Sequence, residues 1–318
     1  MPDYLDFEQP LRELDERIAA LEPAARDALL SERARLERRL YATLTPIDRV
    51  RLARHPSRPQ TLDYIAALLR DFVELHGDRR FGDDRAIVAG IGYFGKQRVA
   101  IVGQQRGRST AERVACNFGR PNPEGYRKAA RIYELAERFG LPLLTFIDTQ
   151  GAEPGLGAEE RGQAEAIAHC LLVMAGLTVP VIATVIGEGG SGGALALGVA
   201  NVLLMQEHAC YAVITPEGCA AILWREGTPE NIARAASALK LEAHDLLELG
   251  VADKIVAEPR GGAHRDPKRA ALLLGRVIRR ELRALTKLTP AQIRAARAAK
   301  LAALGQAFLE RAPARAGR

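Results

Sequence analysis

The sequence predicts an α/β protein with a largely parallel sheet, and three observations support this class. The 318 residues are 47% hydrophobic and 26% charged, as expected for a globular chain with a buried core. Between residues 86 and 257, short β-branched runs alternate with segments of helical period, which is typical of parallel sheets. Outside that range the apolar residues follow only helical spacing. We therefore expect a helical segment 1–80, an α/β core 81–257 and a helical segment 258–318.

The N-terminal segment predicts a helical hairpin over residues 9–44. Apolar residues repeat at helical spacing on both sides of a break at Glu22-Pro23. A histidine and prolines between Leu52 and Gln60 indicate a linker. A further helix is expected over Leu62–His76.

The central segment is expected to begin with a β-hairpin, in which Ala86–Tyr93 and Val99–Gln104 flank the turn Phe94-Gly95-Lys96-Gln97. Alternating elements follow: a helix over 123–140, a strand over 141–148, a helix over 158–175, a strand over 179–186, a helix over 192–199, strands over 202–205 and 211–214, and a helix over 217–224. Residues from Arg265 to Phe308 are expected to be helical, with Thr289 capping a last helix that begins at Pro290.

Composition and cysteine spacing exclude several classes of protein. The four cysteines form no C-x-x-C pair, so neither a zinc knuckle nor a disulfide framework is indicated, and a cytoplasmic protein with reduced thiols is expected. The acidic N-terminus lacks the pattern of a secretory signal. Residues 171–187 carry no charge, but Gly176 and Pro180 divide them, and a membrane span needs about 20 apolar residues. A helix end followed by a buried strand is the preferred interpretation.

Positive charge is concentrated at the C-terminal end. The chain has a net charge of +6, yet residues 260–318 hold 15 Lys+Arg and 3 Asp+Glu, a local +12, which leaves −6 for residues 1–259. Clustered basic residues can bind the phosphates of nucleic acid. The alternative is an amphipathic helical pair that packs on its own core or on a partner. We favour packing, because an apolar stripe is predicted from Leu272, Leu273, Val277, Leu282 and Leu285.

The most informative segment is Val185–Ala196, in which a strand runs through five glycines into a helix. As G-x-G-x-x-G, Gly187, Gly189 and Gly192 match a dinucleotide fingerprint, and Glu207 lies 20 residues beyond the first of them, where a ribose ligand is expected. The helix after the fingerprint is predicted to be short for such a crossover. A lone fingerprint is therefore weak support for dinucleotide binding.

The same segment also matches G-x-S-x-G, which resembles a nucleophile elbow centred on Ser191. Such a serine needs a histidine and an acid close to it. The candidate histidines are His208, His244 and His264. His208 lies in a predicted turn and His244 in a charged helix, so an ordinary surface histidine is the simpler interpretation for both.

A third interpretation needs no reactive side chain. Glycines at a helix start leave backbone N–H groups free and allow a ligand to approach the main chain. Such donors stabilise negative charge on an oxygen atom. A second glycine turn, Phe146–Gly157, follows the preceding strand, and adjacent parallel strands end at the same edge of a sheet. Two glycine loops at one edge favour a binding site over two unrelated turns.

Five longer motifs resemble a known family. They are Leu52-Ala-Arg-His-Pro-Ser-Arg-Pro, Asn117-Phe-Gly-Arg-Pro-Asn-Pro-Glu-Gly-Tyr-Arg-Lys-Ala, Gly157-Ala-Glu-Glu-Arg-Gly-Gln, Gly187-Glu-Gly-Gly-Ser-Gly-Gly-Ala-Leu-Ala and Thr215-Pro-Glu-Gly-Cys-Ala-Ala-Ile-Leu-Trp. Together they resemble the carboxyltransferase alpha subunit of bacterial acetyl-CoA carboxylase, and the likeness runs from Tyr4 to Arg265.

The resemblance implies a crotonase-type ββα superhelix with an N-terminal helical hairpin and C-terminal helices. It also implies a biotin-dependent enzyme, in which carboxybiotin on a biotin carboxyl carrier protein gives its carboxyl group to acetyl-CoA. The product is malonyl-CoA for fatty-acid synthesis, and a biotin carboxylase completes the ATP-dependent complex. In this family a beta subunit carries the zinc ribbon and mainly holds the CoA thioester, so an alpha2beta2 heterotetramer is implied. No metal in this chain and no nucleic-acid or membrane partner are expected.

By position in the motifs, the resemblance implies that the N–H groups of Gly192 and Gly193 are oxyanion donors. Gly151 and Ala152 are expected to form a second donor pair. These amides would favour the charge that develops on the ureido oxygen of biotin as it loses its carboxyl group. Biotin itself can then remove the methyl proton of acetyl-CoA, so no catalytic triad is needed.

Three residues beside these donors are expected to bind the cofactor. Gly189 and Gly190 would shape its approach to the main chain. Ser191 is expected to cap the start of the helix rather than to act as a nucleophile.

The chain departs from the family pattern at three positions. Gln150 and Glu153 replace a proline and an aromatic residue in the first glycine turn, and Gln104 replaces a histidine at the end of the hairpin. The carboxylate of Glu153 would be unfavourable near anionic intermediates unless it is paired or points outward.

Other charged residues have both a catalytic and a structural interpretation. The acid/base candidates are Asp148, Glu159, Glu160 and Arg161, of which the two glutamates suit the first turn of a helix. The candidates for contact with CoA are Arg127, Lys128 and Arg131, and a solvated helix face explains them equally well.

Overall fold

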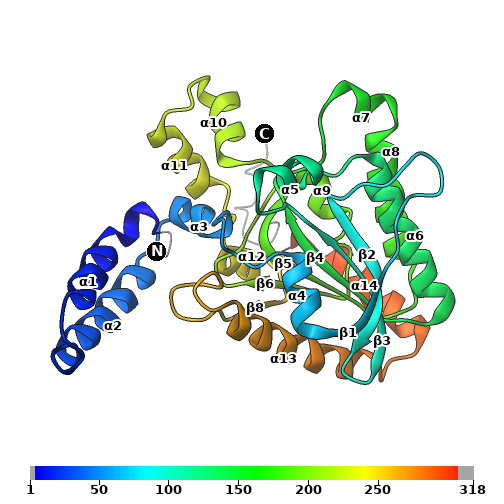
Figure 1. Cartoon of the computed structure of the whole chain (residues 1–318). Coiled ribbons are helices and arrows are strands. Elements are labelled where there is room, and N and C mark those ends of the chain that lie inside the picture. The colour runs from blue at the N-terminus through cyan, green and yellow to red at the C-terminus, as the bar shows by residue number, and fades with distance from the viewer. Residues whose placement is uncertain (1–3, 307–318) are drawn as a thin grey trace, which may run out of the picture.

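A mixed sheet forms the centre of the molecule (Figure 1). The structure is a computed structural model, and it describes residues 4–306. The strands are β1 (Leu69–Glu74), β2 (Ile87–Phe94), β3 (Gln97–Gln104), β4 (Leu143–Thr149), β5 (Val181–Gly190), β6 (Val202–Gln206), β7 (Cys210–Ala212) and β8 (Lys254–Val256). Their order in the described sheet is β1-β2-β3-β4-β5-β6-β8, and β7 pairs with β5. Pairing is antiparallel from β1 to β3 and parallel from β3 onward. The predicted class is confirmed, and the parallel strands end at one edge.

Helices cover both faces of the sheet. One face packs on α6 (Pro123–Phe139) and α8 (Gln163–Gly176), and the other on α4 (Thr61–Leu68) and α13 (Pro267–Leu285). Alternate residues of each strand enter opposite cores: Ile87 faces α6 and α8, whereas Val88 faces α4 and α13. This alternation buries the central strands on both faces, as their near-continuous apolar sequences predict.

The predicted N-terminal hairpin is confirmed as α1 (Gln9–Ala19) and α2 (Asp27–Ala42), which extend away from the sheet in Figure 1. α3 (Pro46–Ala53) connects the hairpin to the core. The fully buried Glu8 accepts a hydrogen bond from Arg265 at 2.7 Å and from Tyr41 at 2.9 Å. These contacts attach the hairpin to the segment that follows β8.

Two predicted elements are wrong in extent. The helix expected over Leu62–His76 ends at Leu68, because the next residues pair with β2 in the antiparallel strand β1. The helix expected over 158–175 is divided into α7 (Leu156–Glu160) and α8, since Gly162 between them has a left-handed φ of 81°.

The second glycine loop also differs from its prediction. β5 continues through Gly190 instead of ending near Ile186, and the helix after it, α9 (Ser191–Leu195), is shorter than expected. Pairing with β4 and β7 on either side keeps the glycines extended. The remaining helices are α5 (Thr110–Ala115), α10 (Pro216–Trp224), α11 (Pro229–Ala238), α12 (Ala243–Glu248) and α14 (Pro290–Ala303). Of these, α10 and α14 are predicted elements that the structure confirms.

The basic C-terminal segment packs on its own core. Leu282 and Leu285 of the predicted stripe are buried, but Leu272 is exposed, because the buried face of α13 is built from Leu274 and Ile278 instead. Thr289 accepts a hydrogen bond from the Gln292 amide, which confirms it as the cap of α14. The predicted helix end at Phe308 lies outside the described residues.

The predicted division into three segments stays a prediction. β1 precedes residue 81 and α13 follows residue 258, yet both belong to the central layers.

None of the helices within residues 4–306 combines the length and the apolar character that a bilayer crossing requires.

Candidate active site

The two glycine loops meet at the carboxyl edge of the sheet, as the sequence predicts. Thr149 at the end of β4 pairs with Gly189 in β5. A Cβ atom added to Gly190 would lie 2.1 Å from the carbonyl oxygen of Gln150. A Cβ atom added to Gly193 would lie 2.7 Å from the amide nitrogen of Ala152. The loops therefore touch main chain to main chain, which only glycine permits at these two positions.

Three amides at this contact are unpaired. Within residues 4–306, the N–H groups of Ala152, Gly192 and Gly193 take no part in the backbone hydrogen bonds of the loops, turns and helix caps. For the two glycines the reason is their place in the first turn of α9, where amides have no partner one turn earlier in the helix. An N–H without an acceptor is rare inside proteins and is a ready donor for a bound oxygen atom.

Gly151 does not fit its predicted role as a free donor. Its φ of 152° folds the turn back so that its N–H donates to the hydroxyl of Thr149 at 3.0 Å. The second donor pair is thereby reduced to Ala152. Because Ala152 lies against Gly193, the described geometry groups the free amides into one set rather than two.

Ser191 is not the cap of α9, contrary to expectation. The cap position belongs to Gly190, and no side chain bonds the first turn. Ser191 is exposed and has a positive φ of 52°, an uncommon conformation for a residue with a side chain. Within residues 4–306 its hydroxyl has no hydrogen bond to a histidine or a carboxylate. The nucleophile-elbow interpretation therefore lacks its base.

Of the candidate histidines, His208 is buried rather than on the surface as predicted, His264 is also buried, and His244 is exposed as predicted. The His208 ring contacts Arg49 at 3.1 Å, and His264 stacks on His55 with ring centroids 3.9 Å apart. Burial, more than any charge, lowers the pKa of His264 to about 3, so its ring is neutral near neutral pH. Glu207 accepts from the Glu258 amide at 3.0 Å, which gives no support to a ribose-binding role.

Gln104 joins the ends of three elements. Its side-chain amide donates to the carbonyl oxygen of Gly193 at 2.8 Å, and its carbonyl accepts from the Asp148 amide at 2.9 Å. Asp148 in turn accepts from the Glu188 amide at 3.1 Å and from Arg106 at 3.2 Å. One oxygen of the Asp148 carboxylate, Oδ1, thus accepts both bonds and holds the ends of β3, β4 and β5 together.

Glu153 is paired, which removes the conflict expected at this position. Its two carboxylate oxygens accept from the Asn117 side chain at 2.8 Å and from the Gly155 amide at 3.0 Å. Among the acid/base candidates, Arg161 binds Glu124 in an ion pair of 3.1 Å, and Glu159 lies in the first turn of α7 as predicted.

The cationic cluster on α6 has a structural role. Lys128 is fully buried and binds Asp83 at 2.6 Å, and Arg127 binds Asp78 at 2.7 Å. Arg131 donates to the carbonyl oxygens of the segment that precedes Asp78. These contacts favour the structural interpretation over contact with CoA.

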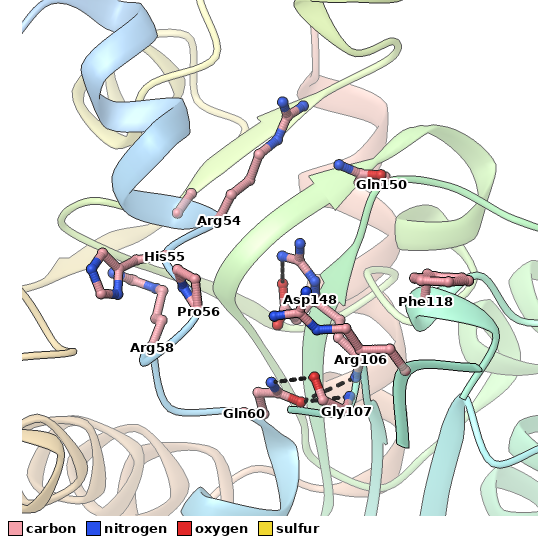
Figure 2. Close-up of a pocket in the computed structure, with 12 residues that line it drawn as sticks. Arg54, His55, Pro56, Arg58, Gln60, Arg106, Gly107, Phe118, Asp148 and Gln150 are labelled. Carbon is pink, nitrogen blue, oxygen red and sulfur yellow. Dashed lines mark hydrogen bonds and ion pairs between the residues drawn. The ribbon is translucent and has the colours of Figure 1, made fainter. Parts of the chain in front are cut away.

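A polar pocket of about 200 Å³ lies beside the first glycine loop (Figure 2). The segment after α3 forms one wall, and Asp148 and Gln150 form another. Arg54 leaves α3 to bind Glu188 at 2.6 Å, and Arg58 binds Glu258 at 2.5 Å. The composition of this segment predicts a linker. Two arginines among its prolines and histidine are the signal that it contacts acidic groups.

An apolar cavity of about 320 Å³ lies on the side of α9. Gly192 and Ser191 contribute to its wall, and the apolar part comes from Leu195, Tyr211, Ala212, Val213, Leu239, Leu246 and Val251. Gly192, one of the two residues with a free amide in the first turn of α9, therefore lies next to an apolar space of ligand size. No group of three His, Cys, Asp or Glu side chains in the described part of the chain could hold a metal ion.

Comparison with known proteins decides the family. A family model described as acetyl co-enzyme A carboxylase carboxyltransferase-like matches residues 4–305. The carboxyl transferase subunit alpha of acetyl-coenzyme A carboxylase from Rhizorhabdus wittichii is 52% identical over 316 residues, which are 96% of this chain and 100% of that protein. The corresponding subunit from Ralstonia pickettii is 51% identical over 313 residues, or 95% and 97%. The chain belongs to this family of acetyl-CoA carboxylase carboxyltransferase alpha subunits.

Solved structures confirm the crotonase-type fold of this family member. A malonate decarboxylase hetero-tetramer from Pseudomonas, in complex with coenzyme A, has a TM-score of 0.61 at 17% identity, over 79% of this chain and 96% of that chain. Transcarboxylase 12S, with methylmalonyl-coenzyme A bound, has a TM-score of 0.55 at 23% identity, over 67% of this chain and 41% of the other. The chain thus spans less than half of the transcarboxylase chain, and at these identities the likeness shows the fold alone.

Proposed function

We propose that this chain forms the carboxybiotin side of a two-subunit active site that transfers a carboxyl group to acetyl-CoA and yields malonyl-CoA. The observation that carries the proposal is the group of unpaired amides on Ala152, Gly192 and Gly193, of which Gly192 lines the apolar cavity. They replace the two separate donor pairs expected from the motifs. Fatty-acid synthesis is the process in which the product is used.

The residues present fit carboxybiotin. Bound there, this cofactor supplies the carboxyl group, and negative charge develops on its ureido oxygen as the group is transferred. The amides would donate to that oxygen, and the apolar wall from Leu195 to Val251 suits the hydrocarbon part of the ring system and its arm. Gly189 and Gly190 would contribute by their small size, which lets β5 pack closely against the Tyr211 ring and the Gln150 main chain.

The chain's own contribution is to hold donors in place before the reaction. Backbone amides fixed by two touching loops need no reorganisation when charge appears, and in a site shielded from water they are worth several kcal/mol. Among the described residues, no carboxylate and no histidine lines the apolar cavity beside Gly192, and Asp148 lines the polar pocket instead. Proton removal from acetyl-CoA is therefore assigned to the bound cofactor and the partner subunit's side of the site.

A carboxyltransferase beta subunit is the proposed partner, and the segment beyond β7 is the proposed docking surface. Val213, Ile222 and Leu223 are 77%, 70% and 62% exposed. Val213 also contributes to the apolar cavity, and α10 with α11 projects beyond the sheet in Figure 1. Large apolar side chains exposed next to a binding site are typical of a protein interface. A biotin carboxyl carrier protein, a biotin carboxylase and an alpha2beta2 assembly complete the proposed complex.

Mixing the purified chain with a zinc-ribbon beta subunit tests the function. We expect malonyl-CoA breakdown in the presence of biocytin only when both subunits are present, because the CoA thioester is assigned to the beta subunit. The measurement is the initial rate of acetyl-CoA formation for each subunit alone and for the mixture. Turnover by this chain alone would contradict the divided site, and no turnover by an assembled mixture would contradict the activity.

Leu223→Asp is expected to weaken assembly with the beta subunit by about tenfold or more, because a buried charge replaces apolar contact at an interface. The matched control is Leu272→Asp, which changes another exposed leucine (56%) on α13. Sedimentation velocity over a concentration series would measure both dissociation constants. Equal dissociation constants for the two variants would place the interface elsewhere.

A further inference from the structure

Gln104 is a fully buried carboxamide whose two ends are both used. It is the last residue of β3, and its relative exposure is 0%. The amide end donates to the Gly193 carbonyl at 2.8 Å, and the carbonyl end accepts from the Asp148 amide at 2.9 Å. Its two partners are far away along the chain: Gly193 is separated from Gln104 by 89 positions and Asp148 by 44. These contacts therefore exist only in the folded protein.

Gly193 needs such a contact because nothing in its own chemistry fixes its backbone. Glycine populates a wide range of φ and ψ, and two glycines in succession leave the amide directions poorly determined. The bond from Gln104 fixes the planar peptide group between Gly193 and Ala194. The Cα atom of Gly193 is closely packed. Three atoms would lie within 3 Å of a Cβ added there, and they belong to Ala152, the Tyr126 hydroxyl and Gly151. Because the peptide group after the Gly193 Cα and the Cα itself are both restrained, rotation about the Gly193 backbone bonds is limited, and with it the direction of the Gly193 N–H.

We propose that Gln104 is a positioning residue that holds the Gly193 amide in register with the Ala152 amide on the neighbouring loop. The proposal rests on the proposed function, in which these amides stabilise the oxyanion. Through Asp148 the same side chain holds the end of β4, from which the loop carrying Ala152 departs. One carboxamide thereby fixes the spacing between the two halves of the donor set.

Three substitutions separate the two hydrogen bonds. Gln104→Met removes both of them at similar volume. Gln104→Glu keeps an acceptor for Asp148 but sets a carboxylate oxygen against the Gly193 carbonyl, so the donor is lost. Gln104→His can supply one donor and one acceptor in its neutral form and is the conservative variant.

The neighbouring Gln105 provides a matched control. It too is buried and makes two side-chain hydrogen bonds, to the Gln60 side chain at 2.8 Å and from the Leu62 amide at 3.2 Å. None of its bonds reaches the glycine loops. Gln105→Met therefore loses as many hydrogen bonds as Gln104→Met without touching the donor set.

The experiment measures kcat and KM of the complex assembled with the beta subunit, together with amide hydrogen exchange of residues 187–199. For Gln104→Met and Gln104→Glu we expect kcat to fall about tenfold or more, with little change in KM for malonyl-CoA. Exchange in residues 187–199 should become faster, since a tethered segment is released. Gln104→His should recover much of the loss, and Gln105→Met should change neither kcat nor exchange in that segment.

Two outcomes would overturn the positioning role of Gln104. The first leaves the proposed function intact, and the second contradicts it as well. If Gln104→Met matches Gln105→Met in kcat and exchange while Gly193→Ala is inactive, Gln104 does not position the amide but the proposed function stands. If Gly193→Ala is also fully active, the amide role itself is wrong and the positioning role fails with it.

Discussion

Gly193→Ala is expected to lower kcat for carboxyl transfer about a hundredfold or more, the usual effect of losing a preorganised oxyanion donor. The added Cβ would lie 2.7 Å from the Ala152 nitrogen, 2.8 Å from the Tyr126 hydroxyl oxygen and 2.9 Å from the Gly151 carbonyl carbon. Two of these atoms are backbone, so the glycine loops must separate and their amides can no longer point at one oxygen. Steady-state kinetics of the assembled complex would measure the loss.

Gly192→Ala is the control for that substitution. Its Cβ would meet only the Ile167 side chain, at 3.6 Å, which is an ordinary contact. We expect a smaller loss of activity than for Gly193→Ala, since the Gly192 amide remains and the contact between the loops is undisturbed. If Gly192→Ala lost as much activity as Gly193→Ala, separation of the loops would not be the cause.

Arg58→Met is expected to lower the free energy of unfolding by about 3–5 kcal/mol, because it leaves a buried carboxylate without its partner. Arg58 is 3% exposed and donates to Glu258, to the Gln206 side chain and to the Ile186 carbonyl. It thus attaches the segment after α3 to the ends of β5, β6 and β8. Urea unfolding followed by circular dichroism would measure the change.

Arg51→Met is the matched control, since Arg51 is a partly exposed arginine whose ion pairs with Asp48 and Asp6 are worth at most about 1 kcal/mol. Replacing Arg58 and Glu258 together by apolar residues should recover part of the lost stability. A loss for Arg58→Met no larger than that of Arg51→Met would show that the buried pair does not hold the segment.

The same ion pair predicts the direction of acid sensitivity. Burial tends to raise the pKa of Glu258, but Arg58 outweighs it and lowers this pKa to about 2. The folded-state pKa lies below the unfolded value of about 4.3, so the unfolded chain binds the proton first as the pH falls. The stabilisation is complete above the unfolded value and is lost as the pH falls towards 2. The urea midpoint of Glu258→Gln should lack this part of the pH dependence.

Local patterns predict most helices and strands of this chain correctly. They fail where pairing with a distant strand overrides the local propensity of the sequence. The strand β1 follows a helical pattern directly, and only its pairing with β2 converts Leu69–Glu74 to a strand. The glycines from Gly187 to Gly190 have no strand propensity, yet β4 and β7 hold them in the sheet.

The candidate site divides in the same way. Glycine content and position predict that two loops meet at one edge, and the comparisons support the family to which the motifs point. The occupied amide of Gly151, the pairing of Glu153 and the place of Arg58 are not readable from the sequence, because each depends on its hydrogen-bond partner in the folded chain.

The sequence by itself determined the α/β class, the amphipathic helices and the two glycine loops, since periodicity and glycine content act over a few residues. The tertiary structure alone decided which side chains hold the glycine loops and the segment after α3 in place. Gln104 and Gly193, like Arg58 and Glu258, become neighbours only when strands far apart along the chain are assembled into one sheet.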